Sequence, residues 1–282
     1  MNYKKIMGAV TALGVAATLA ACGAEKDPMS KSGYDWAIPE TQAMQDDNFN
    51  NPAMLWVGIA EEEWKKPAGE LKKACADCHG KAAGTFSGAD AGRYQIEPYI
   101  QSMRGVAAKD FPRLTKDGKV QTLEEQIMAC QTDNQKAKPW KWESDQMLGM
   151  TALIKMQSRG MPLEVAKDAD EASDPMHKAW QTGKDYFNER RGLLDMACQH
   201  CHGEYPGVKL RANTLTQAQI IGFPTYRLKW QKPGSLHRRY RGCNNEVRAQ
   251  PQAEGSDIYK DLEVFMSWRS RGLLIESPAV RN

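Results

Sequence analysis

The hydrophobic and polar positions along the chain predict an apolar leader, then a polar segment, and then a series of helices. Residues 6–21 are apolar, follow Lys4 and Lys5, and end in Leu-Ala-Ala before Cys22. This pattern is typical of an export signal over residues 1–22, and it is too short for a permanent membrane span. The same four residues match a lipobox, so Cys22 is either a lipid anchor or an incidental cysteine of an ordinary signal. In both cases we expect the mature protein in the periplasm.

The polarity pattern then divides the remaining chain into an arm and two units. Residues 23–51 are polar, contain two prolines and show little periodicity, which predicts an extended arm or linker. Weak helical periodicity starts near Pro52, and an acid-rich break between Pro162 and Pro175 precedes a second start. No run of alternating strands interrupts this pattern. We therefore expect a mainly α fold with domains at 52–168 and 169–282.

The two predicted units repeat each other. Cys-x-x-Cys-His-Gly occurs at 75–80 and again at 198–203, and each half then has one solitary cysteine, Cys130 and Cys243. After each solitary cysteine a helix is predicted, at 144–160 and 256–272, with a Ser-Asp start that favours a serine N-cap. Internal repetition of this kind indicates two domains with one plan, related by duplication.

Composition limits the class of protein. The chain has 282 residues, 41% hydrophobic and 26% charged, which is typical of globular domains large enough to have their own cores. The net charge of +3 is too small to indicate a nucleic-acid partner.

Cys-x-x-Cys-His is the attachment signature of c-type haem. Two thiols on one helical turn reach the two vinyl groups, and the next histidine faces the iron. A redox-active cysteine pair or a zinc site would not require a histidine directly after both copies of the motif. The sequence thus predicts two covalently bound haems in two cytochrome c-like domains. The predicted thioether residues and proximal ligands are Cys75, Cys78 and His79 in the first half and Cys198, Cys201 and His202 in the second.

Each haem iron also needs a sixth ligand or an open coordination position. Beyond its motif the second half offers only His237 and Met266, whereas the solitary cysteine is common to both halves. We therefore expect Cys130 and Cys243 to be distal thiolate ligands, which would favour ferric iron and a low potential. The alternatives are a disulfide between these two cysteines or buried thiols without a ligand role.

The two solitary cysteines differ in their charged surroundings. Between Arg227 and Arg248 seven basic residues stand against one acid, whereas the window from Leu114 to Gln135 has two basic residues against four acids. Arginines lower the pKa of a thiol and bind oxyanions through forked donors, which predicts a reactive sulfur at Cys243 beside an anion pocket. A solvated face or a docking patch for an acidic partner would show the same charge run.

At these residues the chain resembles the SoxA family, the dihaem subunit of the SoxAX cytochrome of bacterial sulfur oxidation. The resemblance is carried by Lys229-Trp230-Gln231, by Gly234 through Asn244, by Val247-Arg248-Ala249, by 157–162 and by 277–281, and it extends over about Pro52 to Asn282.

The resemblance implies an L-cysteine S-thiosulfotransferase, which joins thiosulfate oxidatively to a cysteine of the carrier SoxYZ. It also implies that Cys243 is a haem ligand carried as a persulfide, that Arg239 binds the substrate anion, and that Cys130 ligates the first haem. The expected electron acceptor is SoxX, a small cytochrome c partner.

Two other functions agree with the same residues. A dihaem electron-transfer cytochrome would use the basic run only to dock an acidic partner, and its Cys243 would be an unmodified thiol. A haem peroxidase would need an open coordination site, which a low-spin spectrum of both irons would exclude.

Overall fold

The fold is described by a computed structural model that covers residues 31–80, 108–211 and 213–282. Its helices are α1 Pro39–Asp46, α2 Met54–Lys65, α3 Cys75–His79, α4 Leu123–Cys130, α5 Asp145–Met156, α6 His177–Asn188, α7 Cys198–His202, α8 Leu236–Glu246 and α9 Asp257–Arg269. Short helical turns lie at Ala108–Asp110 and Gln131–Gln135. The predicted mainly helical fold is confirmed. None of the helices in these ranges is long and apolar enough to cross a membrane.

The strands are short and lie between helices. They are β1 Arg113–Leu114, β2 Val120–Gln121, β3 Lys209–Leu210, β4 Asn213–Thr214, β5 Thr225–Arg227, β6 Lys232–Gly234 and β7 Ala279–Arg281. β1 and β2 form a hairpin, as do β3 and β4, whereas β5 pairs antiparallel with β6 and parallel with β7. The last sheet brings the C-terminal strand against the basic segment that begins at Arg227.

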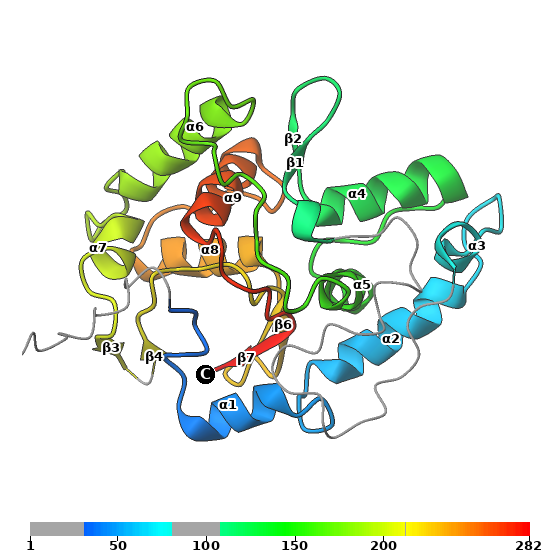
Figure 1. Cartoon of the computed structure of the whole chain (residues 1–282), viewed down its shortest axis with the longest axis horizontal. Helices are drawn as coiled ribbons and strands as arrows, with labels where there is room; N and C mark the ends of the chain where they lie inside the picture. The colour runs from blue at the N-terminus through cyan, green and yellow to red at the C-terminus, as the bar shows by residue number, and fades with distance from the viewer. Residues whose placement is uncertain (1–30, 81–107, 212) are drawn as a thin grey trace, which may run out of the picture.

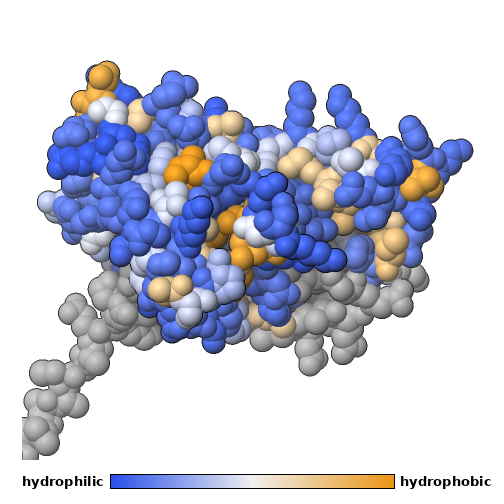
Figure 2. Space-filling view, turned by 90° about the horizontal axis from the view of Figure 1, so that it is seen from above, coloured by the Kyte–Doolittle hydropathy of each residue, from blue (hydrophilic) through white to orange (hydrophobic). Residues whose placement is uncertain are grey.

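Each half is built around one pair of packed helices, and the two halves lie on opposite sides of the molecule (Figure 1). α2 crosses α5 closely enough that a Cβ on Gly149 would stand 2.2 Å from the Trp56 carbonyl oxygen. α6 crosses α9 in the same way, where a Cβ on Gly183 would stand 2.2 Å from the Asp261 carbonyl oxygen. Each pair encloses a separate apolar core. Figure 2 shows a largely hydrophilic face with separate apolar patches.

The predicted starts of α5 and α9 differ in outcome. The Ser144 hydroxyl accepts a hydrogen bond from the Met147 N–H at 3.3 Å, so this N-cap is confirmed. Ser256 precedes α9 with extended backbone, but its side chain accepts no such bond. Both helices end earlier than predicted, at Met156 and Arg269, and the glycines at 160 and 272 then have positive φ angles of 80° and 77°.

The expectation of an extended arm over 23–51 is wrong for its second part. Residues 39–46 form α1, and this segment packs on the chain's own last strand. Gln45, which is fully buried, accepts a hydrogen bond from the Val280 N–H at 3.1 Å, and Asn51 donates to the Pro278 carbonyl at 3.1 Å. Polar side chains here satisfy the free edge of β7, so their polarity does not indicate solvent exposure. The predicted export signal and Cys22 lie outside the described residues.

Candidate active site

The second Cys-x-x-Cys-His motif forms the short helix α7, which presents its histidine in a defined state. His202 Nδ1 lies 2.7 Å from the Thr216 carbonyl oxygen. A carbonyl can only accept, so Nδ1 carries the proton and the Nε2 lone pair is left for a metal. Burial lowers the pKa of His202 to about 4, which keeps the imidazole neutral, as metal ligation requires.

Cys243 comes from a separate helix, α8, and meets the motif on α7. Ser235 caps this helix by accepting from the Arg238 N–H at 3.1 Å, and Cys243 follows two turns later. Burial first and the Cys243 sulfur second raise the pKa of Cys198 to about 11, and the same two causes raise the pKa of Cys201. The three sulfurs are therefore close neighbours. Cys243 and Cys130 are both free thiols, which excludes the disulfide alternative.

Some arginines of the basic run form ion pairs with acidic residues, and Arg239 does not pair with any described acid. Arg238 pairs with Glu143 at 3.6 Å, and Arg241 pairs with Glu254 at 3.0 Å. Arg239 lies four residues before Cys243 on the same helix face, and its guanidinium has no partner among the described residues. Its positive charge contributes to the lowered pKa of His202. Arg239 is thus the arginine of this helix that is left for an anion.

Arg227 is a second arginine at this site and, unlike the half-buried Arg239, it is buried; the sequence did not single it out. It projects from β5 and donates to the Asn282 carbonyl at 2.7 Å and to Asn213 Oδ1 at 2.9 Å. Burial and the neighbouring Arg239 lower the pKa of Arg227 to about 10, while Cys243 acts in the opposite direction. Two guanidinium groups near one sulfur form a cationic site. Only the pairing of β5 with the C-terminal strand places Arg227 there, and no local sequence pattern signals it.

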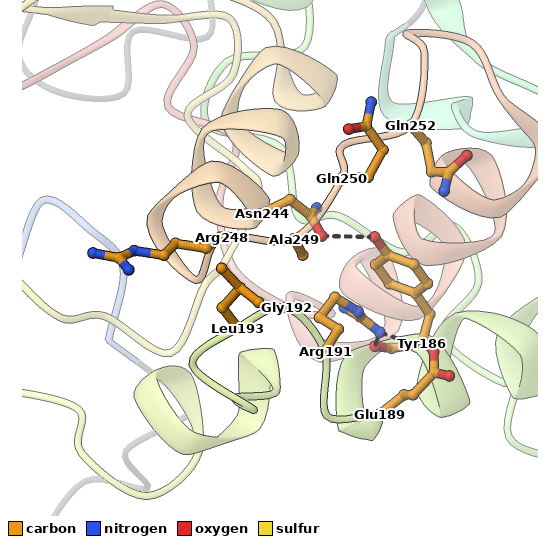
Figure 3. A pocket seen from close by; sticks show the side chains of 10 residues that line it. All are labelled: Tyr186, Glu189, Arg191, Gly192, Leu193, Asn244, Arg248, Ala249, Gln250 and Gln252. Carbon is orange, nitrogen blue, oxygen red and sulfur yellow. Dashed lines mark hydrogen bonds and ion pairs between the residues drawn. The ribbon is translucent and has the colours of Figure 1, made fainter.

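An open polar pocket of about 340 Å³ adjoins the sulfur cluster (Figure 3). Tyr186 faces Asn244, the residue after Cys243, and donates to its Oδ1 at 3.1 Å. Arg191 lies under the Tyr186 ring at 3.6 Å and approaches Cys198 Sγ at 3.8 Å. Arg248, by contrast, points away from these residues (Figure 3). The pocket is therefore lined by direct neighbours of Cys198 and Cys243, namely Arg191 and Asn244.

The first half brings together the corresponding residues with different chemistry. Burial and the Cys130 sulfur raise the pKa of Cys75 to about 11, so Cys130 lies near the α3 motif. Gln126, four residues before Cys130, donates from Nε2 to its Sγ at 3.1 Å. Residues 81–107, which follow His79, lie outside the described ranges.

The two remaining candidates for a sixth ligand in the second half have other partners. His237 is 1% exposed and accepts at Nδ1 from the Gly255 N–H at 2.9 Å, while its Nε2 lies 3.3 Å from Glu263. Met266 is buried in the core of the second half. Neither side chain is free to act as a ligand in this arrangement.

Comparisons with known proteins agree with this arrangement. A family model described as SoxA/TsdA, cytochrome c domain, matches residues 96–163. The chain is 38% identical over 253 residues to the L-cysteine S-thiosulfotransferase subunit SoxA of Rhodovulum sulfidophilum, which corresponds to 89% of this chain and 80% of that protein. It is 34% identical over 252 residues to the protein of the same name from Paracoccus pantotrophus, with coverage of 89% and 79%.

A solved structure shows the same fold. One chain of the crystal structure of SoxXA from P. pantotrophus superposes with a TM-score of 0.77 at 33% identity, over 89% of this chain and 86% of that chain. The similarity in sequence and fold therefore spans both halves.

Proposed function

Because the chain belongs to the SoxA family of L-cysteine S-thiosulfotransferase subunits, we propose that Cys243 is its catalytic sulfur and that Arg239 and Arg227 bind the thiosulfate dianion. The observation that carries this proposal is that the Cys243 sulfur and two arginines, Arg239 and Arg227, lie together at the second Cys-x-x-Cys-His motif.

Two covalent c-type haems belong to the proposal. Each half has two cysteines and a histidine on one helical turn, with a third sulfur from another helix close by. This donor set fits a c-type haem attached through Cys75 and Cys78 with ligands His79 and Cys130, and a second attached through Cys198 and Cys201 with ligands His202 and Cys243. Bound haem supplies the one-electron acceptors that an oxidative conjugation needs.

Internal duplication, with domains at 52–168 and 169–282, is supported by a repeated backbone detail. A Cβ on Gly69 would stand 2.1 Å from the Gln135 carbonyl oxygen, and a Cβ on Gly192 would stand 2.2 Å from the Val247 carbonyl oxygen. Both glycines have positive φ, and both lie six residues before the first cysteine of a haem motif. In each half the same turn thus fixes the chain that follows the solitary cysteine.

The reaction balances with Cys243 as a persulfide. Thiosulfate and the persulfide form a new sulfur–sulfur bond, one proton is released and two electrons leave. The carrier thiol then attacks the sulfane sulfur of the bound group, forms the carrier S-thiosulfonate and restores the persulfide with its proton. Arg239 and Arg227 hold the sulfonate oxygens through both steps, which orients the sulfane sulfur toward Cys243. The pocket beside Asn244 gives the carrier access.

The proposed partners are SoxX, which receives the electrons, and SoxYZ, which supplies the carrier cysteine. SoxX is supported by the match to a chain of a SoxXA structure. A cytochrome c domain agrees with periplasmic maturation of the chain. A dihaem cytochrome without a substrate site loses its support, because the relatives are thiosulfotransferase subunits.

The test compares the two solitary cysteines. We expect Cys243→Ala to lower thiosulfate conjugation at least about 1,000-fold, whereas Cys130→Ala retains most of the activity because Gln126 stands near Cys130 where Arg239 stands near Cys243. Mass spectrometry of the carrier measures conjugation, and haem staining with intact mass verifies that both variants keep both haems. Full conjugation by the Cys243→Ala protein with its haems intact would refute the proposal.

A further inference from the structure

A buried group of acids and one imidazole lies where the two halves meet, and the proposed reaction does not use it. Its members are Glu124 on α4, His237 on α8 and Glu263 on α9, which are 8%, 1% and 5% exposed. Charged groups are rarely buried without a partner because desolvation is costly. Burying three titratable groups together is therefore costly, which suggests that they have a role.

The imidazole is held in one orientation. His237 Nδ1 accepts from the Gly255 N–H at 2.9 Å, so any ring proton is on Nε2, which faces Glu263 at 3.3 Å. The Trp142 ring of the first half stacks on the imidazole with a centroid distance of 4.8 Å. Glu263 is therefore the direct partner of a histidine that cannot turn away.

Glu124 joins this pair from the first half. Its neighbour Glu125 forms an ion pair of 3.1 Å with Lys260, which docks the first turn of α4 on α9. Burial and the charge of Glu263 raise the pKa of Glu124, against the opposing effects of Lys155 and His237. Two buried carboxyl groups thus lie near one buried imidazole, and Glu263 is the one at ion-pair distance from it.

The other charged or titratable groups among the described residues that face the cluster are paired, bonded or packed, except for Lys155. Lys260 is bound by Glu125 and Asp257, and Arg238 by Glu143. Lys155 on α5 acts on Glu124, and Tyr259 bonds Asn244 and Gln252. Tyr240 packs against the His237 ring, and the charge of Glu263 raises its pKa further above the usual range. The charge of the cluster is therefore set by its own protons against the fixed positive charge of Lys155.

The position of the cluster connects it to both proposed haem sites. Glu124 and His237 are each the second residue of their helices, and each lies six residues before the solitary cysteine, Cys130 or Cys243. Six helical residues span about 9 Å along the axis. At that range, with an effective dielectric constant of about 20, one unit charge changes a proton affinity on the order of tenfold.

We propose that Glu124, Glu263 and His237 form one redox-linked proton-binding site, which rests on the proposed function for its haems. When one electron enters the ferric iron ligated by Cys130 or Cys243, the cluster takes up one proton from solvent. The proton returns to solvent when the electron passes to the partner cytochrome. The site would let the chain hold the reaction's electrons without accumulating buried negative charge.

The experiment is a redox titration of the holoprotein, with both haems followed by their visible spectra, at a series of pH values. At a fixed potential we expect the ferrous-to-ferric ratio of at least one haem to fall as pH rises, by twofold to tenfold per pH unit, tenfold corresponding to 59 mV. In Glu124→Gln and Glu263→Gln proteins we expect less than a twofold change. Glu164→Gln, which removes an exposed acid paired with Lys167 on the surface, is the matched control and should keep the wild-type dependence.

A redox-difference infrared spectrum gives a second readout that mere structural damage would not reproduce. We expect the carbonyl band of a protonated carboxyl group to appear on reduction and to vanish in Glu124→Gln or Glu263→Gln. A wild-type ratio that is independent of pH, or an unchanged dependence in both variants, overturns the proposal. Neither result depends on conjugation, so the Cys243→Ala assay decides the proposed function separately.

Discussion

The two solitary cysteines occupy the same place on equivalent helices, yet their neighbours differ in the one position that decides their chemistry. Cys130 and Cys243 each lie eight residues after a hydroxyl N-cap, Thr122 or Ser235. Four residues before the cysteine the first half has Gln126, which donates to the sulfur, and the second half has Arg239. Both halves therefore hold a sulfur near a Cys-x-x-Cys-His motif, while only the second places an arginine one helical turn before that sulfur.

The surroundings extend this difference. Near Cys130, Gln126 is itself bonded by Arg113, so this arginine is already committed. Near Cys243, Arg227 comes from β5 and adds a second guanidinium to that of Arg239. An anion at the second site would contact two arginines that neighbour the cysteine, whereas the pocket at Cys130 is lined by Lys116, the committed Arg113 and an acid, Asp133. This difference between the halves supports the proposal that the substrate anion binds at the second cysteine.

Arg239→Gln is the strongest test of this comparison, because it gives Cys243 the neighbour that Cys130 has. Glutamine can donate a hydrogen bond to the sulfur, as Gln126 does to Cys130, but it removes the charge, so we expect kcat/KM for thiosulfate to fall about 100- to 1,000-fold. Steady-state conjugation assays measure the loss. The haem spectra should stay unchanged, and Arg241→Gln, whose arginine is paired with Glu254, is the matched control. A kcat/KM within threefold of wild type would mean that Arg239 does not bind the substrate.

Gly192→Ala tests whether the shared turn holds the chain after Cys243. The new Cβ would stand 2.2 Å from the Val247 carbonyl oxygen at a φ of 72°, so we expect a loss of about 2–4 kcal/mol in the free energy of unfolding. Gly118→Ala has a similar φ of 77° but meets nothing within 4 Å, and should cost only about 1 kcal/mol. Denaturant unfolding of both proteins compares the two values. Equal losses of unfolding free energy in the two variants would show that the close contact with residue 247 does not contribute to stability.

Local patterns predicted the parts of the site that lie within one helical turn. Both Cys-x-x-Cys-His motifs form short helices, and the Ser144 cap is present, because these features depend on residues only three or four positions apart. Arg227 could not be found in this way. It reaches the site through pairing of β5 with β7, fifty-four residues later in the chain. In the sequence alone, Arg227 is only one of the seven basic residues between positions 227 and 248.

Exposure was predicted wrongly for polar residues that hydrogen-bond buried backbone groups. Gln45 and Asn51 looked like parts of a solvated arm, but both are buried and bond the C-terminal strand. Glu124 likewise counted only as one acid in the charge balance around Cys130, whereas its burial against Glu263 depends on the packing of the two halves. Composition cannot distinguish a polar side chain in water from one that bonds the protein interior.

Arg227→Gln tests the comparison between the two cysteines at a residue that lies on β5 and not on α8. Glutamine can retain one of the bonds to Asn213 or Asn282 but removes the second cation of the site, so we expect KM for thiosulfate to rise about tenfold with a smaller change in kcat. Arg227→Lys, which keeps the charge without the fork, should recover part of the loss. The same conjugation assay separates KM from kcat. An unchanged KM would confine anion binding to Arg239.

The smallest expected difference concerns the two hydroxyl caps that start the cysteine-bearing helices. Thr122 accepts from the Glu125 N–H at 3.3 Å, so Thr122→Ala should lower the free energy of unfolding by about 1 kcal/mol. Ser235 accepts from the Arg238 N–H at 3.1 Å and also from the Trp142 indole of the first half at 3.2 Å. Ser235→Ala should cost about 2 kcal/mol, since it also leaves a partly buried indole N–H without its acceptor.

Trp142→Phe removes that donor, so a double-mutant cycle of Trp142→Phe with Ser235→Ala isolates the part of the difference that crosses between the halves. We expect a coupling of about 0.5–1 kcal/mol in denaturant unfolding. The corresponding cycle of Trp142→Phe with Thr122→Ala should show none, because Thr122 bonds within its own helix start. Equal coupling in both cycles would show that the first half does not act selectively on the start of α8. In that case the cationic site at Cys243 would owe its placement to the second half alone.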